Sequence, residues 1–459
     1  MPALPPPTEA RPARPEMSKH KFIDLFAGCG GLSLGLSLAG LQGQFAIERD
    51  AMAFKTFEHN FLGDRDVPIT KFAWPSWLDR QAWPIDELLD KHHADLSRLR
   101  NQVDVLAGGP PCQGFSFAGK RQALDPRNQL FEKYVQVVDA IRPRALVLEN
   151  VPGMGVAHST QDGPGKGRGK ARESYYDKLR QKLDAAGYDV HGNVLDASRF
   201  GVPQRRSRLI VLGLDKHLAA RLPGGIERVF ELLEEQRVAQ LRDLGLGEAL
   251  TAPEAISDLE AERAEKKSCV DPDSRGPFEE AVYRGPLTTY QRLMHGDCGA
   301  GAMDSMRLAR HTAKVRERFA AIQDECRRGV LMDKASRDKH GLRKHRIHPM
   351  SPGQPAPTIT TLPDDVLHYA EPRILTVRES ARLQSFPDWF HFRGNFTTGG
   401  ERRTKECPRY TQVGNAVPPY LGRAIGLAIV AAIDEATRFT GPVRPLDMPK
   451  PGQLEFALD

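Results

Sequence analysis

Short apolar runs alternate with segments of helical periodicity over the first half of the chain. The pattern predicts strands over residues 21–28, 44–50, 103–110, 144–151 and 208–214, and helices over residues 32–40, 85–101, 129–143 and 175–188. Such alternation predicts an α/β fold with a doubly wound, mostly parallel sheet. Ligands of these sheets bind beyond the carboxyl ends of the strands, so the chemistry of this chain is expected in the loops that follow them.

The pattern changes after about residue 214. Charged helices are predicted over residues 227–244 and 255–267, irregular sequence follows, and strong patterning returns in residues 373–390. A last apolar helix within residues 412–436 is expected to pack back on the first unit. The sequence thus predicts a disordered Pro-rich tail over residues 1–20, which lacks the apolar core of a signal peptide. The sequence also predicts a catalytic domain over residues 21–214, which residues 405–459 complete. A second, smaller domain with a hinge is predicted over residues 215–404.

The composition is that of a soluble globular protein, with 459 residues, 40% of them hydrophobic, and a mean hydropathy of −0.46. No stretch approaches the roughly 18 apolar residues that a membrane span needs. The six cysteines form no CxxC pair, which argues against disulfides and a structural zinc site and predicts a reducing, cytoplasmic setting. The formal charge is +6, and residues 310–346 hold twelve Lys or Arg against five Asp or Glu. A nucleic-acid contact and a solvated surface both fit this bias.

A Gly-rich turn closes the first predicted strand. The sequence DLFAGCGG, residues 24–31, ends a strand and opens a helix, and Glu48 ends the next strand about 20 residues later. Glycines let a ligand approach the backbone, and an acid at that place can bind the hydroxyls of a ribose. A nucleoside cofactor is therefore predicted, although Ser33 breaks the dinucleotide pattern G-x-G-x-x-G. A turn that binds nothing is the alternative.

Three further loops carry reactive side chains. Cys112 lies in GGPPCQGFS, outside any apolar run, which suits an exposed nucleophile better than a packed thiol. Glu149 ends the strand ALVLEN, where a carboxylate is costly unless it is paired or working. Arg206 and Arg208 in QRRSR are two residues apart, so in a strand they share one face, and that face could hold the Cys112 thiolate or orient Glu149. A structural ion pair and a surface basic cluster are the plainer interpretations.

Taken together and in order, these motifs resemble those of the cytosine-C5 DNA methyltransferases. The motifs span residues 24–419 and read DLFAGCGG, GGPPCQGFS, ENVPG, QRRSR, RESARLQSFPD and QVGNAVPP. The resemblance implies a Rossmann-like domain of the S-adenosylmethionine-dependent methyltransferase type, with a target-recognition domain between QRRSR and RESARLQSFPD. It also implies a catalytic cycle in which a cytosine leaves the stack and Cys112 attacks its carbon 6. Glu149 would contact ring nitrogen 3 and the exocyclic amine, with Arg206 and Arg208 in support.

The resemblance also assigns binding residues. Those implied for the cofactor, S-adenosylmethionine with S-adenosylhomocysteine as product, are Phe26, Ala27, Gly28, Cys29, Gly30, Gly31, Leu32, Glu48, Pro110, Asn415 and Val417. Those implied for DNA are Gln113, Ser116, Gly119 and Arg127 in the loop after Cys112, together with Arg343, Lys344 and Arg346 in the basic stretch. Asp66 and Ile69 are both candidates for the adenine contact. In RESARLQSFPD, Arg378 and Glu379 are expected to brace the two domains.

Double-stranded DNA is therefore the expected partner of a monomeric cytoplasmic enzyme, associated with the nucleoid through DNA, without a metal or a membrane. The target sequence and the presence of a cognate restriction endonuclease stay open. An RNA methyltransferase of the same fold is a rival, against which GFS after Cys112 and the long recognition region weigh. A catalytically silent subunit is a second rival, although every chemical residue is present. A nicotinamide dehydrogenase would leave Cys112, Glu149 and the arginine pair without a role.

Overall fold

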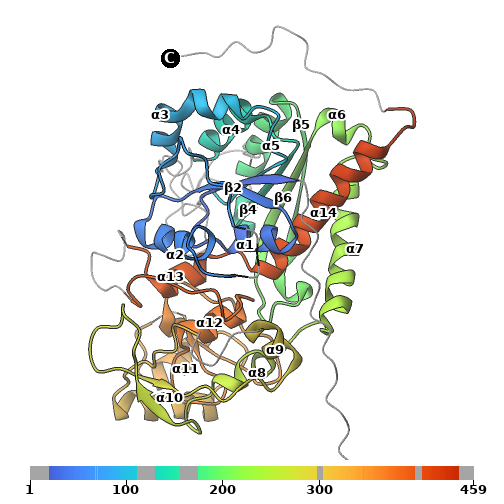
Figure 1. Cartoon of the computed structure of the whole chain (residues 1–459). Coiled ribbons are helices and arrows are strands. Elements are labelled where there is room, and N and C mark those ends of the chain that lie inside the picture. Colours follow the sequence, from blue (N-terminus) through green and yellow to red (C-terminus); the bar gives the residue numbers. More distant parts are fainter. Residues whose placement is uncertain are drawn as a thin grey trace, which may run out of the picture.

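A six-stranded sheet forms the centre of the computed structural model, which describes residues 20–67, 69, 71–110, 130–155, 174–296, 303–344, 346–397 and 406–443. The strand order is β2-β1-β3-β4-β6-β5 (Figure 1). The strands are β1 (Lys21–Leu25), β2 (Gln42–Ile47), β3 (Val105–Gly108), β4 (Ala145–Asn150), β5 (Tyr188–Asp196) and β6 (Ser207–Asp215). β1 to β4 pair in parallel and β6 runs antiparallel to both neighbours, which confirms the predicted mostly parallel sheet.

Helices cover both faces of the sheet, as a doubly wound fold requires. Along β4, Val147 packs into one apolar core and Leu148 into the other, because successive side chains of a strand point to opposite faces. One face carries α3 (Ile85–Arg98), α4 (Leu130–Ile141) and α5 (Tyr175–Ala185); the other carries α1 (Gly31–Leu38), α2 (Ala51–Phe61) and α14 (Pro419–Arg438).

The sequence did not reveal β5, the edge strand beside β6. Its centre holds His191, Gly192 and Asn193, residues of low strand propensity, and Val194 is 56% exposed. Pairing along the whole of β6 supplies the order that the local sequence lacks.

The predicted return of the last helix is confirmed, because α14 packs against α1 through small residues. A Cβ atom at Gly35 would lie 2.6 Å from the Gly422 Cα and the Pro419 carbonyl oxygen, so the two backbones touch. The segment Arg409–Arg438 is the one part of the described chain that is long and apolar enough to cross a membrane, and 78% of its apolar window is buried inside the protein. That burial is typical of a core helix.

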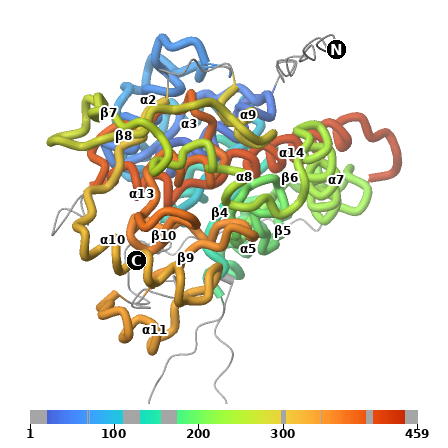
Figure 2. Tube along the Cα trace, turned by 90° about the horizontal axis from the view of Figure 1, so that it is seen from below, coloured from blue at the N-terminus to red at the C-terminus, as the bar shows by residue number. Residues whose placement is uncertain are grey.

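Helix α7 (Glu227–Leu244) runs beside α14 in both Figure 1 and Figure 2. The Gln240 side-chain amide donates to the carbonyl oxygens of Phe200 and Tyr420 at 2.9 and 3.0 Å, and Arg228 pairs with Glu435 at 3.4 Å. These contacts group α7 with the sheet, although the sequence places it in the second unit. The short α6 (Lys216–Ala219) precedes it.

The second unit is built from short elements around buried ion pairs. Its helices are α8 (Ala252–Ile256), α9 (Thr289–His295), α10 (Ala313–Glu325), α11 (Lys334–Lys339) and α12 (Val377–Leu383), and its strand pairs are β7 (Lys266–Ser268) with β8 (Glu279–Ala281) and β9 (His348–Pro349) with β10 (Val366–Leu367). The helix predicted over residues 255–267 is wrong: α8 stops at Ile256 and a 3-10 turn follows. Asp258 in that turn is buried and accepts from Arg382 and Tyr283, a tertiary contact that outweighs helix propensity.

Arg378 and Glu379 lie fully buried in α12 and stabilise the second unit itself. Arg378 donates to the Pro387 and Phe390 carbonyls at 3.2 and 2.8 Å, and Glu379 pairs with Arg373 at 2.7 Å. The expected brace between the domains is not seen in these contacts. Two glutamines form one of the links between the units instead.

The side-chain amide of Gln204, three residues before β6, donates to Gln384 Oε1 at 2.9 Å. Gln384 in turn donates to the Val413 carbonyl at 2.7 Å, in α13 (Arg409–Asn415). These two buried side-chain amides therefore connect the two units through successive hydrogen bonds.

Candidate active site

An ion pair lies at the carboxyl end of β4. Arg208 Nε is 2.7 Å from Glu149 Oε1, and the two side chains are 14% and 13% exposed. The pair forms because β6 is antiparallel to β4, which brings the first residues of β6 beside the last residues of β4. The contact expected between Glu149 and the arginine motif is therefore made by Arg208. A mostly buried pair that still reaches solvent can orient a polar ligand.

The backbone that leaves β3 passes directly against this pair. A Cβ atom at Gly109 would lie 3.4 Å from Glu149 Oε2, and the Asn150 amide donates to the Pro110 carbonyl at 2.9 Å. Cys112 lies outside the described residues, together with Gln113, Ser116, Gly119 and Arg127.

Arg206 has a different environment from Arg208. Its side chain is buried, at 1% exposure, and donates to the carbonyl oxygens of Ile359, Gly414 and Ala416 at 3.1, 2.9 and 3.0 Å. Burial lowers the pKa of Arg206, with the positive charge of Arg208 as the next cause. Of the two arginines expected to support Glu149, Arg208 touches the carboxylate, whereas Arg206 joins three backbone segments. Spacing in the sequence could not separate them.

The Gly-rich turn presents an open backbone beside an acid. Gly28 has a φ of +57°, and a Cβ atom there would meet nothing within 4 Å. Glu48 accepts from the Gly28 amide at 2.9 Å and from the Asp50 amide at 2.8 Å. Phe26 also has a positive φ, 60°, an uncommon conformation for a side-chain residue that is often retained at ligand sites. Space above Gly28 and a fixed carboxylate at its side fit a ribose-bearing cofactor.

Five other predicted cofactor residues are buried or have their backbone amides bound within the protein. The Ala27 and Gly30 amides are already used, by the carbonyls of Ile47 and Ala27 at 3.0 and 2.9 Å, so they cannot donate to a ligand. The Cys29 thiol is buried and donates to the Gln412 carbonyl at 3.7 Å, and burial raises its pKa to about 12. Gly31 and Leu32 are also buried.

The two motifs that flank the predicted pocket touch each other. A Cβ atom at Gly31 would collide with the Val417 carbonyl oxygen, so only glycine allows this approach. Val417 is buried, whereas Asn415 at the end of α13 is exposed. Of the two adenine candidates, Asp66 is exposed and Ile69 is half-buried against the main core.

A buried carboxylate, that of Asp24, lies near the end of β1, just before the Gly-rich turn. Asp24 is 1% exposed and accepts from the Ser33 hydroxyl at 2.6 Å. Burial, helped by the negative charge of Glu48, raises the pKa of Asp24 to about 7. Burial likewise raises the pKa of Glu48. Ser33, the residue that breaks the dinucleotide pattern, therefore has a structural function: it satisfies the buried Asp24.

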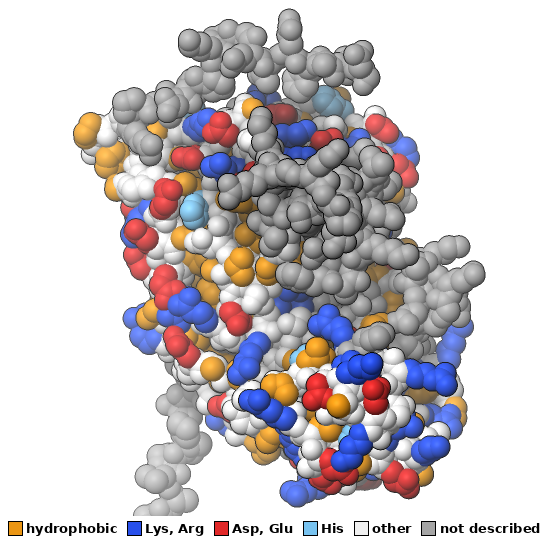
Figure 3. Space-filling view, turned by 180° about the vertical axis from the view of Figure 1, so that it is seen from behind, with side chains coloured by type: hydrophobic (Ala, Val, Ile, Leu, Met, Phe, Trp, Pro, Cys, Tyr) orange, Lys and Arg blue, Asp and Glu red, His pale blue; other side chains and the backbone are white. Residues whose placement is uncertain are grey.

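The basic stretch of the second unit is only partly available to DNA. Lys344 is paired with Asp364 and Asp365 at 2.5 and 2.7 Å, whereas Arg343 and Arg346 are exposed. Figure 3 shows Lys and Arg side chains spread over this lobe with Asp and Glu among them. The sequence could not reveal that acids about 20 residues away neutralise Lys344.

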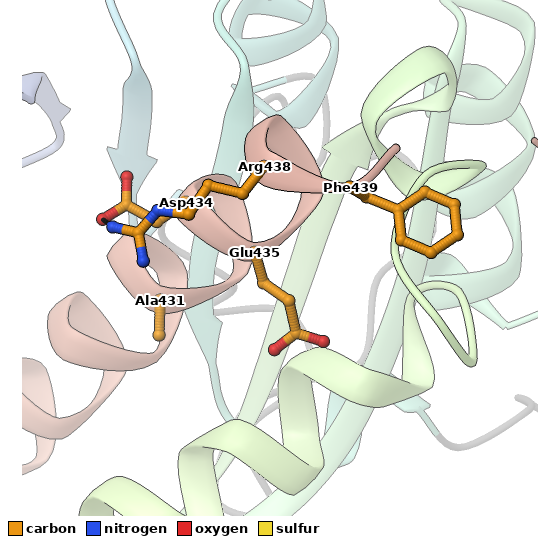
Figure 4. Close-up of a pocket in the computed structure, with 5 residues that line it drawn as sticks. All are labelled: Ala431, Asp434, Glu435, Arg438 and Phe439. Carbon is orange, nitrogen blue, oxygen red and sulfur yellow. Dashed lines mark hydrogen bonds and ion pairs between the residues drawn. The ribbon is translucent and has the colours of Figure 1, made fainter. Parts of the chain in front are cut away.

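An open recess lies at the far end of α14, away from these residues. It is lined by Ala431, Asp434, Glu435, Arg438 and Phe439 (Figure 4). None of the predicted catalytic or cofactor residues lines it. Glu435 also pairs with Arg228 of α7, so the recess is a seam between packed helices.

Comparison with known proteins gives one family across nearly the whole chain. The family described as C-5 cytosine-specific DNA methylase matches residues 20–431. The chain is 31% identical to the Type II methyltransferase M.DdeI of Desulfomicrobium norvegicum, over 88% of this chain and 87% of the relative. It is 30% identical to the Type II methyltransferase M.XorII of Xanthomonas oryzae pv. oryzae, over 94% of this chain and 88% of the relative.

A solved structure agrees with the fold. The crystal structure of a DNA modification methyltransferase encoded within a prophage (E. coli) superposes with a TM-score of 0.57 at 23% identity. The alignment covers 91% of this chain and 100% of that one.

Proposed function

Because the chain belongs to the C-5 cytosine-specific DNA methylase family, we propose that it methylates carbon 5 of one specific cytosine in double-stranded DNA, with S-adenosylmethionine as methyl donor. Membership makes the chain a DNA cytosine-5-methyltransferase; the duplex substrate, the flipped base and the residue roles are the proposal. The observation that carries it is the Arg208–Glu149 pair at 2.7 Å, beside the backbone that leads to Cys112.

The chemistry begins at carbon 6 of the cytosine. Carbon 5 is a poor nucleophile until Cys112, as thiolate, forms a bond to carbon 6 and moves electron density to carbon 5. Glu149 holds the proton at ring nitrogen 3 and accepts from the exocyclic amine, which stabilises the adduct. The bound S-adenosylmethionine supplies the methyl group that carbon 5 attacks. A base then removes the carbon-5 proton, and the Cys112–carbon 6 bond breaks to release the product.

Arg208 and Arg206 contribute in different ways. The Arg208 guanidinium fixes Glu149 and offers its remaining N–H groups to the cytosine carbonyl. Arg206 acts as a positioning residue, since its three carbonyl partners tie the start of β6 to residues 359 and 414–416. The base reaches this site only after leaving the helical stack, because neither face of carbon 6 is open within a duplex.

The cofactor binds at the Gly-rich turn in this proposal. Glu48 accepts from the ribose hydroxyls, Phe26 packs on the adenine, and the open backbone at Gly28 admits the methionine part. Asn415 and Val417 close the pocket. The support is the space at Gly28 and the carboxylate fixed beside it.

Trapping the adduct tests the mechanism. DNA that contains 5-fluorocytosine should form a covalent complex with the full chain in the presence of S-adenosylmethionine, because fluorine cannot leave as a proton does. Cys112→Ser should abolish the complex and methyl transfer while cofactor binding persists. Retained turnover by that variant would overturn the mechanism, and the absence of any Cys112-dependent adduct on methylatable DNA would favour a silent subunit.

The RNA-directed rival is separated by substrate. Tritiated methyl transfer measured side by side on unmethylated duplex DNA and on tRNA should label the DNA, and labelling of tRNA alone would refute the proposal. The setting we propose is a bacterial cytoplasm, where the enzyme acts as a monomer. The names of the Type II relatives support a partnership with a restriction endonuclease of the same specificity.

A further inference from the structure

Arg205 is an exposed cation between two fully buried neighbours. Gln204 is 0% exposed and Arg206 is 1% exposed, and the side chains of both are held by buried hydrogen bonds. Arg205 lies between them in extended chain and is exposed, because alternate residues of an extended segment point to opposite sides. The position of its backbone is therefore set by its neighbours.

Both backbone groups of Arg205 are also bound to the second unit. The Arg205 amide donates to the Ala356 carbonyl at 2.8 Å, and the Thr358 hydroxyl donates to the Arg205 carbonyl at 2.7 Å. An exposed side chain on a fixed backbone binds with a smaller loss of entropy than one on a free loop. Arg205 is thus preorganised at the junction between the two units.

The guanidinium of Arg205 is unpaired among the residues that the structure describes. Within the described part of the chain, no carboxylate or carbonyl is paired with it, whereas Arg206 is bound to three carbonyls and Arg208 to Glu149. Arg205 precedes Arg208 by three residues, so their Cα atoms lie within roughly 10 Å of each other, and the alternation turns the Arg205 side chain to the side opposite Arg206 and Arg208. An exposed cation therefore lies at the junction of the two units, on the outer side of the segment that carries the catalytic arginine.

We propose that Arg205 binds a backbone phosphate of the bound DNA at the junction between the two units. This inference rests on the proposed function. Phosphate is the anion that accompanies every base into such a site, and the planar guanidinium fits two of its oxygens at once. The contact positions the strand and reads no sequence, because phosphates are alike along DNA. Arg205 is accordingly a positioning residue, and the base itself is left to Glu149 and Arg208.

The test compares three variants of the full chain: Arg205→Gln, Arg205→Lys and, as a matched control, Arg221→Gln. Arg221 is also an exposed arginine, unpaired among the described residues, but it follows the far end of β6, roughly 30 Å along that strand. Affinity for a short mixed-sequence duplex is measured by fluorescence anisotropy over a range of KCl concentrations. Steady-state methylation of unmethylated duplex DNA gives kcat and KM separately.

Arg205→Gln should lower affinity roughly fivefold to tenfold near 0.1 M salt and reduce the salt slope, log K against log[salt], by about one. KM should rise by a similar factor with kcat within about twofold, since a uniform binding contact is removed. Arg205→Lys should restore most of the slope, and Arg221→Gln should match the unsubstituted protein.

An unchanged slope and KM for Arg205→Gln, while the unsubstituted chain methylates DNA, would overturn this inference and leave the proposed function standing. A lower melting temperature with an unchanged slope would also overturn it, because it would indicate a structural role. Failure of the unsubstituted chain to methylate DNA would instead refute the proposed function.

Discussion

Replacing Arg206 by Lys should destabilise the protein while leaving the catalytic pair intact. The guanidinium spans three carbonyl oxygens, those of Ile359, Gly414 and Ala416, at 2.9 to 3.1 Å. A lysine ammonium is a compact charge on a flexible stem and cannot bridge three carbonyls that a planar fork reaches. We expect at least two of the three bonds to be lost.

The cost can be worked from those bonds. A hydrogen bond to a charged group contributes about 1.5 to 3 kcal/mol, so the loss of two lowers the free energy of unfolding by about 3 to 6 kcal/mol. With an unfolding entropy of about 2.1 cal/mol/K per residue, a chain of 459 residues changes by about 1 kcal/mol per degree. The melting temperature should therefore fall by about 3 to 6 °C.

Arg208→Lys is the matched control for chemistry. Lysine keeps a positive charge beside Glu149 in this mostly buried pair and breaks no link between backbone segments, so the melting temperature should fall by less than in Arg206→Lys, by about 1 to 2 °C. Its kcat/KM should fall on the order of 10²-fold, because the group that orients Glu149 and faces the base is lost. Calorimetry and single-turnover methylation, both below the melting transition, measure the two effects.

The opposite pattern would refute the division of roles. If Arg206→Lys melted like the unsubstituted protein and lost activity like Arg208→Lys, Arg206 would be a group that contacts substrate. If both variants lost stability equally, the Glu149 pair would be structural.

Three further outcomes follow from buried groups. In urea unfolding, the stability of Asp24→Asn minus that of the unsubstituted protein should increase by roughly 2 to 3 kcal/mol as pH is raised from about 5 to about 8. The fold raises the pKa of Asp24 to about 7, so the unsubstituted protein is most stable below about pH 4, where Asp24 is protonated in both the folded and the unfolded state. This stability is lost as pH rises to about 7. Parallel pH curves for the two proteins would contradict the prediction. Gly35→Ala should destabilise by about 1 to 3 kcal/mol despite the better helix propensity of alanine, with Gly247→Ala, where nothing lies within 4 Å, as the tolerated control. Lys344→Gln should leave the salt slope of DNA binding unchanged, whereas the exposed Arg343→Gln should reduce it; equal effects would refute the ion-pair assignment.

The sequence determined the sheet core and the motif order. Apolar runs and helical periodicity placed β1, β2, β3, β4 and β6 and the helices α1, α3, α4 and α5, because those segments are apolar on the faces that they bury; α2 was not predicted. Residue type in each motif fixed the candidate chemistry, since a thiol, a carboxylate and a guanidinium in strand-end loops have few plainer uses. These signals are local, and a single chain carries them.

Tertiary structure alone decided which arginine does what. Arg206 and Arg208 are chemically identical and two residues apart, yet one is bound by carbonyls from residues 359 to 416 and the other by Glu149. The same holds for Lys344, neutralised by Asp364 and Asp365, and for the helix that stops at Ile256. Each outcome depends on partners far along the chain, and the energy of a polar side chain is set by its partners more than by its own identity.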